Sequence, residues 1–508
     1  MEKTSVKTLN DLIKLSAQEH GSCIFVKEKQ GNEIAEKTFA EFYEDCKKVY
    51  SYLKPMGKIH TAIIGPTSYN YLVSRLGTVI GGNAAVPIDA QLSCDDICDL
   101  LRRADVTVFF YDSRFEKYLP QIKEECPDIQ TFICLDKEDG LAAILAENTP
   151  EEPAEISPDT MAEIVYTSGT TGKSKGVMLS HANYVDNTFC RDGEATEEDS
   201  LLTLLPIHHV YCYTCDILLS LRYGTTVCVN DSMMRIPQNL KLFQPTIILL
   251  VPMIAATIYK QIKAAAAANP QIPVKLIATG VFGGRLKGIY SGGAYLDPEL
   301  IKAYAEFGIP IAQGYGMTEC SPRISSIKFD EGSFGDVGII VNGCEVKTVD
   351  GELLVKSPSV MAGYYKDPEA TAEALTPDGW LRTGDLGYVE NNRIYITGRK
   401  KNLIILSNGE NVSPEELENK FVSADIVADV LVYAEDGTIT AEIFPDPQYC
   451  KDMTAEEVSA TITELIGNIN KTVAPSKMIR RIRLRNVEFE KTTSKKIKRT
   501  QSIQGDII

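Results

Sequence analysis

Residues 166–176, YTSGTTGKSKG, concentrate hydroxyl groups, glycines and lysines in one short segment. Hydroxyls and lysines bind phosphate oxygens, and glycines let the backbone approach a ligand closely. A Walker-type phosphate loop has the pattern G-x-x-x-x-G-K-[ST]. Here only two residues separate Gly169 from Gly172, so Lys173 and Ser174 come too early for that pattern. The segment is therefore predicted to bind phosphate in another way.

Three other polar, glycine-rich segments follow short apolar runs. They are SGGA (291–294), GYGMTE (314–319) and RTGDLG (382–387). In a doubly wound sheet, loops at the carboxyl ends of the strands line the crevice where ligands bind. Each segment alone is compatible with an ordinary turn, whereas the four segments together indicate one shared ligand site.

A fifth segment, PIHHVYCYTC (206–215), pairs two histidines with Cys212 and Cys215 and raises the question of a zinc site. Structural zinc is usually held by two ligand pairs separated by a loop. These four side chains are instead crowded into one short span, and this spacing favours packing over metal binding for His208 and the two cysteines.

Composition excludes several classes of protein. A chain of 508 residues is too long for one hydrophobic core, so several compact units are expected. The net charge of −17 argues against a nucleic-acid partner, which requires an excess of Lys and Arg. Only residues 477–499 are markedly basic, and they leave room for a small polyanionic ligand.

Segments that would direct the chain to a membrane or out of the cell are not evident. The N-terminal residues lack the apolar centre of a signal peptide, and the longest apolar run, residues 246–259, is too short to span a bilayer. The thirteen cysteines form no small-domain framework, which is typical of free thiols in a reducing compartment. A cytoplasmic protein without a transmembrane segment is expected.

The elements that must position the polar segments follow an α/β rhythm. Residues 60–89 contain an apolar run, a helical pattern and a second apolar run, which predicts a βαβ unit. Similar apolar runs recur up to about residue 320 and predict two doubly wound α/β subdomains. From about residue 330, short alternating runs predict a small antiparallel β subdomain, and a separate α+β unit is expected after residue 400.

Five motifs carry a resemblance to a known family. They occur in the order YTSGTTGKSKGVMLSHAN, GYGMTECSP, WLRTGDLG, GRKKNLIILSNGENVSPEELE and KTTSKKIKR. The chain resembles the acyl-adenylate-forming (AMP-binding) superfamily over nearly its whole length, and most of all the fatty-acyl-CoA synthetases. The resemblance implies that a carboxylate attacks the α-phosphate of ATP to give acyl-AMP and pyrophosphate, and that the thiol of CoA then displaces AMP. Mg²⁺ is the implied metal ion.

The resemblance also implies domains and nucleotide-binding residues. An N-terminal domain of residues 1–400 would bind nucleotide and acid, and a smaller mobile C-terminal domain of residues 401–508 would rotate about a hinge at Lys401. Within the large domain, Tyr315 would offer a flat face to adenine, while Asp385 would bind the ribose hydroxyls. The complete implied set of cofactor-binding residues is Thr167, Ser168, Gly169, Thr170, Thr171, Gly172, Lys173, Gly292, Gly293, Ala294, Tyr315, Gly316, Asp385, Arg399, Lys401 and Gly409.

The implied catalytic residues are Lys496, Thr318, Glu319 and His209. Thr318 would donate to phosphate, Glu319 would bind Mg²⁺, and His209 would lie at the mouth of the acyl pocket.

Lys496 would bridge the carboxylate and phosphate oxygens during adenylation. The sequence departs from the family pattern P-K-T-x-S-G-K-I at two positions, because Glu490 replaces Pro and Lys495 replaces Gly. Lys495 is therefore a competing assignment, whereas Ile497 fixes the register in favour of Lys496.

For the acyl group, the motifs most resemble those of fatty-acyl-CoA ligases, which favours a medium- or long-chain fatty acid. The segments around Val210, Tyr211 and Tyr213 also carry no cation that could bind a second charge on the acid. An aryl or other non-fatty acid stays open, and so does a carrier-protein phosphopantetheine as the thiol. The partners expected are therefore the carboxylate, ATP and CoA, with an acyl carrier protein as the alternative, in a monomer or homodimer. A rival interpretation is a non-catalytic scaffold with the same fold, which would lack residues of the types found at Glu319, Asp385 and Lys496.

Overall fold

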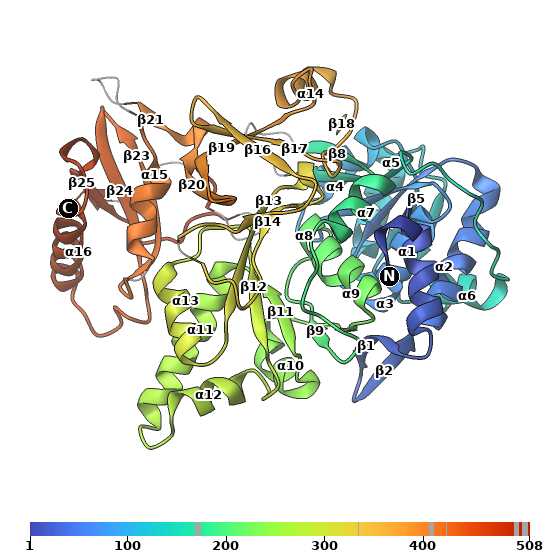
Figure 1. Cartoon of the computed structure of the whole chain (residues 1–508), viewed down its shortest axis with the longest axis horizontal. Helices are drawn as coiled ribbons and strands as arrows, with labels where there is room; N and C mark the ends of the chain where they lie inside the picture. The colour runs from blue at the N-terminus through green and yellow to red at the C-terminus, as the bar shows by residue number, and fades with distance from the viewer. Residues whose placement is uncertain are drawn as a thin grey trace.

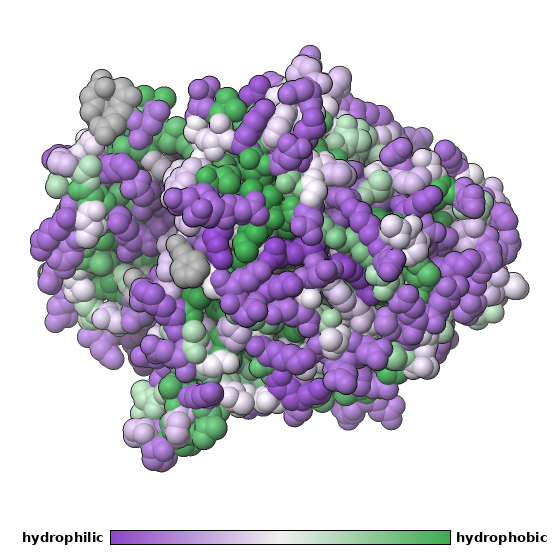
Figure 2. Space-filling view, viewed as in Figure 1, coloured by the Kyte–Doolittle hydropathy of each residue, from purple (hydrophilic) through white to green (hydrophobic). Residues whose placement is uncertain are grey.

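The computed structural model describes residues 1–167, 174–333, 335–405, 411–422, 424–491, 497–499 and 506–507. Figure 1 shows three packed parts: an N-terminal part in blue, a central part in green and yellow, and a C-terminal part in orange and red. Figure 2 shows hydrophobic residues gathered at the centre of the same face, over strands of the central part, within a surface that is otherwise largely hydrophilic.

The N-terminal part is built around a seven-stranded sheet. In spatial order its strands are β18 (Gly363–Tyr364), β8 (Lys175–Ser180), β7 (Met161–Thr167), β4 (Ala84–Ile88), β3 (His60–Ile64), β5 (Val106–Tyr111) and β6 (Thr131–Cys134). The helices of this part are α2 (Phe39–Leu53), α3 (Tyr69–Val79), α4 (Cys94–Arg103), α5 (Leu119–Glu125), α6 (Ala143–Glu147) and α7 (His181–Phe189). Strands β3 and β4 are parallel and α3 connects them, which confirms the βαβ unit predicted for residues 60–89.

The central part is built around a thirteen-stranded sheet. Six neighbouring strands of this sheet are parallel, and the strands from β14 onward are antiparallel. Its parallel strands are β1 (Ile24–Gln30), β10 (Thr226–Cys228), β9 (Ser200–Leu202), β11 (Ile247–Leu250), β12 (Gly288–Ser291) and β13 (Ile311–Gly316), with β2 (Glu33–Thr38) antiparallel at the edge. The antiparallel strands are β14 (Arg323–Ser326), β15 (Ile339–Ile340), β20 (Arg393–Arg399), β19 (Leu381–Glu390), β17 (Glu352–Lys356) and β16 (Glu345–Val349). The predicted small β subdomain is therefore a continuation of the second sheet through β14.

Eight further helices precede the C-terminal part in the described residues. They are α1 (Leu9–His20), α8 (Val210–Cys212), α9 (Leu219–Tyr223), α10 (Ile236–Phe243), α11 (Pro252–Ala268), α12 (Val274–Val281), α13 (Pro298–Glu306) and α14 (Pro368–Ala374). A π-helical stretch, Tyr213–Leu218, joins α8 to α9 into one helical segment. The apolar run of residues 246–259 forms β11 and the start of α11, as a buried strand followed by a helix.

The C-terminal part has a core of its own. Its elements are β21 (Ile404–Ile405), β22 (Asn411–Val412), α15 (Pro414–Glu418), β23 (Val427–Glu435), β24 (Thr438–Pro445), α16 (Ala455–Asn470), β25 (Arg481–Leu484) and β26 (Asp506–Ile507). Thr454 and Glu457 form a capping box at the start of α16, and Ile462 and Ile466 of this helix are buried against the sheet. The architecture agrees with the predicted α/β class with a smaller α+β unit at the C-terminal end.

A fully buried ion pair between α3 and β7 lies within the N-terminal part and contacts the segment before α8. The guanidinium of Arg75, on α3, donates from Nε and Nη2 to the two carboxylate oxygens of Glu163, on β7, at 2.6 and 2.7 Å. Both side chains are 0% exposed. Arg75 also donates from Nη1 to the carbonyl oxygen of Ile207 at 2.6 Å and stacks on the ring of Tyr213, while Tyr184 donates to Glu163. This pair therefore fastens the segment before α8 to the first sheet.

The described residues bear on two predictions, that the chain has no transmembrane segment and that its cysteines are free thiols. Within those ranges, no helix is long and apolar enough to cross a membrane. All thirteen cysteines are described, and each is a free thiol. The cytoplasmic location itself stays a prediction.

Candidate active site

The strand β13 brings its tyrosine against β19. Tyr315 donates from its hydroxyl to Oδ2 of Asp385 at 2.6 Å, and the Nε of Arg399 lies 2.7 Å from Oδ1 of the same carboxylate. Asp385 is 3% exposed, and it faces Arg399 across the antiparallel pair of β19 and β20. Tyr315, Asp385 and Arg399 are all predicted to bind the nucleotide, and they meet at the Asp385 carboxylate.

Two glycines let backbone segments approach each other beside Tyr315. A Cβ atom on Gly316 would lie 2.1 Å from the carbonyl oxygen of Pro322, which no larger residue tolerates. A Cβ atom on Gly292, just after β12, would lie 3.1 Å from the carbonyl oxygen of Gly314. The adjacent Gly293 has a positive φ of 81°, a conformation that glycine adopts without a steric cost. The SGGA and GYGMTE segments are thus neighbours, as predicted.

Glu319 has a partner that the sequence motifs did not reveal. Thr318 and Glu319 lie in a short 3₁₀ turn after β13, and Tyr364 of β18 donates from its hydroxyl to Oε1 of Glu319 at 2.8 Å. Burial and the nearby Glu319 carboxylate raise the pKa of Tyr364, so this hydroxyl keeps its proton and remains a donor. One carboxylate oxygen is thereby held in place, and the other can face a cation.

Several predicted residues lie outside the described part of the chain. They are Ser168, Gly169, Thr170, Thr171, Gly172, Lys173, Gly409 and Lys496, together with the competing Lys495. Of the phosphate segment, Thr167 ends β7 and pairs with Lys175 of β8. Of the C-terminal motif, Ile497, which follows Lys496, is described.

One large cavity connects these residues. Its volume of about 2670 Å³ exceeds the roughly 300–1,000 Å³ of a typical single-ligand pocket, so it has room for more than one substrate. The described predicted residues that line it are Thr167, His209, Gly292, Gly293, Ala294, Tyr315, Gly316, Thr318, Glu319, Asp385, Arg399 and Lys401, and Ile497 lines it too. The structure thus brings together every predicted site residue that it describes.

The helical segment from α8 to α9 forms one wall of the cavity. Tyr211, Cys215, Leu219 and Tyr223 all line it, and their spacing of four residues places them on one face of the helix. We call the part of the cavity walled by these four residues and by Tyr290 of β12 the deep pocket.

His209 precedes α8 at the start of this wall, and its ring centroid lies 4.3 Å from that of His208. Burial and the neighbouring His209 lower the pKa of His208, which favours the neutral ring. In the described ranges, no group of three or more His, Cys, Asp or Glu side chains is arranged to hold a metal ion.

The deep pocket also contains a cation that the sequence analysis missed. Arg323, at the start of β14, lines the cavity near Cys215, Tyr223 and Tyr290. A pocket without a cation was predicted from the segment around Val210, Tyr211 and Tyr213, and of these Tyr213 is fully buried away from the cavity lining. The arginine that follows the GYGMTECSP motif was the available signal.

Asp216 supports a prediction about pH. It is 0% exposed in the π-helical stretch, and burial raises its pKa to about 8. The folded-state pKa lies above the unfolded value, so the protonated form of Asp216 is the one that favours the folded state. Its contribution to the free energy of unfolding is fully present below about pH 4 and is lost as the pH rises to about 8. Asp216→Asn should therefore stabilise the protein by about 3 kcal/mol more at about pH 8.5 than at about pH 5.5, as measured by urea unfolding.

The exposed Asp452→Asn serves as the control for this prediction. Equal effects of Asp216→Asn at the two pH values would contradict it.

The comparison with protein families agrees with the geometry. The sequence profile of the AMP-binding enzyme family matches residues 15–365, well over half of the chain. The chain belongs to this family. The profile of the AMP-binding enzyme C-terminal domain matches residues 401–505.

Similar proteins include two from Arabidopsis thaliana. Peroxisomal long chain acyl-CoA synthetase 6 is 30% identical over 86% of this chain and 74% of its own length. Peroxisomal long chain acyl-CoA synthetase 7 is 31% identical over 59% of this chain, a match that spans only 50% of that relative.

Among solved structures, the anthranilate CoA ligase AuaEII in complex with anthranoyl-AMP has a TM-score of 0.86 and 20% identity, and the match covers 98% of both chains. This likeness confirms the predicted fold class of the AMP-binding enzyme.

Proposed function

We propose that this AMP-binding enzyme is an AMP-forming acyl-CoA synthetase that activates a medium- or long-chain aliphatic carboxylic acid. The observation that carries the proposal is that Tyr315 and Arg399 both contact the carboxylate of Asp385. This carboxylate and Glu319 line one cavity, which continues into the deep pocket. The similarity to long chain acyl-CoA synthetases supports the choice of a fatty acid and of CoA.

In the first half-reaction, a carboxylate oxygen of the acid attacks the α-phosphorus of ATP, and the bond to the β-phosphate breaks to release pyrophosphate. Asp385 would accept hydrogen bonds from the ribose hydroxyls. A carboxylate has about four acceptor positions, so the contacts with Tyr315 and Arg399 leave room for the ribose. Thr318 would donate to the α-phosphate, and the segment of residues 167–173 would bind the β- and γ-phosphates.

Glu319 is the residue that would hold Mg²⁺. Hard cations prefer carboxylate and phosphate oxygens, and Mg²⁺ commonly takes one or two protein carboxylates plus substrate phosphates. The hydrogen bond from Tyr364 fixes the orientation of this carboxylate. The ion would neutralise charge on the phosphates.

In the second half-reaction, the thiolate of CoA attacks the carbonyl carbon of acyl-AMP, and AMP leaves. We propose that residues 401–508 rotate about Lys401 between the two steps, so that Lys496 serves adenylation and Gly409 then faces the thiol. Lys401 lies two residues after Arg399, so the proposed hinge directly follows the nucleotide contact.

The test is the exchange of labelled pyrophosphate into ATP in the presence of a panel of fatty, aryl and small carboxylic acids. Exchange that depends on a fatty acid, followed by release of AMP when CoA is added, is the expected result. Replacing CoA by a phosphopantetheinylated carrier protein distinguishes the two thiols. Absence of exchange with every acid would contradict the proposal and favour the scaffold interpretation, and formation of ADP would indicate a different reaction class.

A further inference from the structure

Arg323 introduces a full positive charge into a pocket proposed to bind an acyl chain. Its Nε lies 3.4 Å from Oδ1 of Asn187, and its Nη2 donates to the carbonyl oxygen of Asn187. In the described part of the chain, Arg323 forms no ion pair, and its Nη1 donates no hydrogen bond. A guanidinium stays protonated in proteins, and an uncompensated charge in a confined pocket costs free energy. A bound group that accepts hydrogen bonds would remove this cost.

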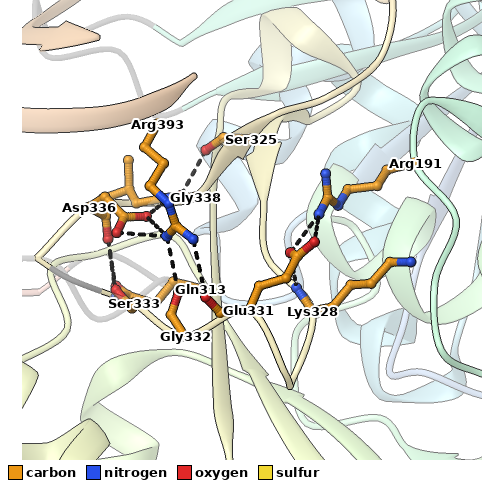
Figure 3. A network of polar contacts seen from close by, with 11 residues as sticks. Arg191, Gln313, Ser325, Lys328, Glu331, Gly332, Ser333, Asp336, Gly338 and Arg393 are labelled. Atoms are coloured by element: carbon orange, nitrogen blue, oxygen red, sulfur yellow. Dashed lines mark hydrogen bonds and ion pairs between the residues drawn. The ribbon is translucent and has the colours of Figure 1, made fainter. Parts of the chain in front are cut away.

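Arg191, which also lines the cavity, is already paired with Glu331. Arg191 and Glu331 form an ion pair at 2.5 Å, and Figure 3 shows the Glu331 carboxylate held between Arg191 and the backbone N–H of Lys328. Arg393 fixes the same segment by donating to the carbonyl oxygen of Glu331, as Figure 3 also shows. The Glu331 carboxylate therefore has two partners, and neither is Arg323.

A further carboxylate beside the pocket is Glu194. Its Oε2 accepts from the hydroxyl of Tyr290 at 3.0 Å and from the backbone N–H of Phe329 at 2.9 Å. These contacts hold Glu194 on the β12 side of the pocket, and among the described residues it forms no ion pair with Arg323.

Unpartnered buried hydroxyls lie along the same cavity. Ser220 of α9 and Ser291 of β12 are 1% and 2% exposed, both line the cavity, and among the described residues neither Oγ atom has a hydrogen-bond partner. Buried polar atoms are nearly always hydrogen-bonded, so each of these hydroxyls is expected to meet a polar group of a bound substrate or an ordered water. A purely hydrocarbon chain would satisfy neither these hydroxyls nor Arg323.

We propose that the deep pocket selects aliphatic acids that carry a second carboxylate, and that Arg323 is the residue that binds it. The inference rests on the proposed acyl-CoA synthetase activity and specifies its substrate class. Cys215 and Tyr223, the helix residues near Arg323, follow Tyr211 by roughly 6 Å and roughly 18 Å along the helix. The ring of Tyr211 lies beside Gly292, a predicted nucleotide-binding residue. The second carboxylate would therefore lie within this range of the nucleotide side of the cavity, which matches medium-chain dicarboxylic acids.

The experiment compares decanedioic, ω-hydroxydecanoic and decanoic acids as substrates of the full-length protein, with kcat/KM measured by AMP release. The wild type should prefer decanedioic acid. Arg323→Met should lower kcat/KM for decanedioic acid by about 100-fold, because it removes one partner of a desolvated charge pair. It should raise kcat/KM for decanoic acid by about 10-fold, since an apolar chain then meets an apolar wall, and this gain shows that the variant folds.

Two further variants sharpen the comparison. Arg323→Lys keeps the charge and should retain most of the preference, whereas Arg102→Met, the same kind of change at a half-exposed arginine of α4, should leave the selectivity as it is. Preference of the wild type for decanoic or ω-hydroxydecanoic acid, or equal losses for all acids in Arg323→Met, would overturn the inference.

Calorimetry separates this inference from the proposed function. Binding of decanedioic acid that is lost in Arg323→Met supports the Arg323 site even if no acid is turned over. Turnover of decanoic acid without calorimetric binding of decanedioic acid would leave the synthetase activity standing and overturn the assignment to Arg323.

Discussion

Lys496→Ala is expected to lower the rate of acyl-AMP formation by roughly 10²- to 10³-fold, the usual cost of removing one preorganised contact to developing charge. Its ammonium is proposed to bridge the attacking carboxylate and the α-phosphate during adenylation. Thioester formation from supplied acyl-AMP should continue, because the carboxylate has already been activated. The measurement is pyrophosphate exchange for the first step and release of AMP from acyl-AMP plus CoA for the second.

Lys495→Ala is the matched control, because Lys495 is the competing assignment one residue earlier. It should affect adenylation far less than Lys496→Ala does. A Lys496→Ala protein that is equally impaired in both half-reactions, or a Lys495→Ala protein with the larger defect, would contradict the assignment.

Glu163→Gln is expected to destabilise the N-terminal domain by about 3–5 kcal/mol, because it leaves the buried guanidinium of Arg75 without a counter-charge. The substitution keeps the volume of the side chain, so the loss would come from charge and hydrogen bonding. Both partners are 0% exposed, which removes solvent screening. Urea unfolding measures the free energy.

Two comparisons test the electrostatic explanation. Glu125→Gln breaks the exposed pair with Arg102 and should cost only about 0–1 kcal/mol. The double variant Arg75→Met/Glu163→Met removes both charges and should recover part of the loss, although Tyr184 and the Ile207 carbonyl then lack their partners. A loss below about 1 kcal/mol for Glu163→Gln would contradict the prediction.

Much of the fold and of the nucleotide side could be predicted from sequence, because strand-end loops with Gly and polar residues carry their own local signature. Tyr315 and Asp385 are 70 residues apart, yet each stands in a recognisable segment, and they meet as expected.

Arg323 and Tyr364 could not be predicted in the same way. Nothing in the local pattern states that the β14 arginine would lack a carboxylate partner, or that a tyrosine 45 residues after Glu319 would bind it. Such properties depend on which distant segments pack together. The same holds for β1, whose partner β10 follows it by about 200 residues.

The pairing of β1 with β10 has a consequence during synthesis. The hairpin of β1 and β2 leaves the ribosome well before β10, because the neighbour of β1 is completed only about 200 residues later. At roughly 5–20 residues per second, the edge of β1 waits for about 10–40 seconds. Its sequence contains Lys27, Glu28 and Lys29, and charged side chains on an open edge oppose pairing with other chains. These residues would therefore protect the newly made chain from aggregation until β10 arrives.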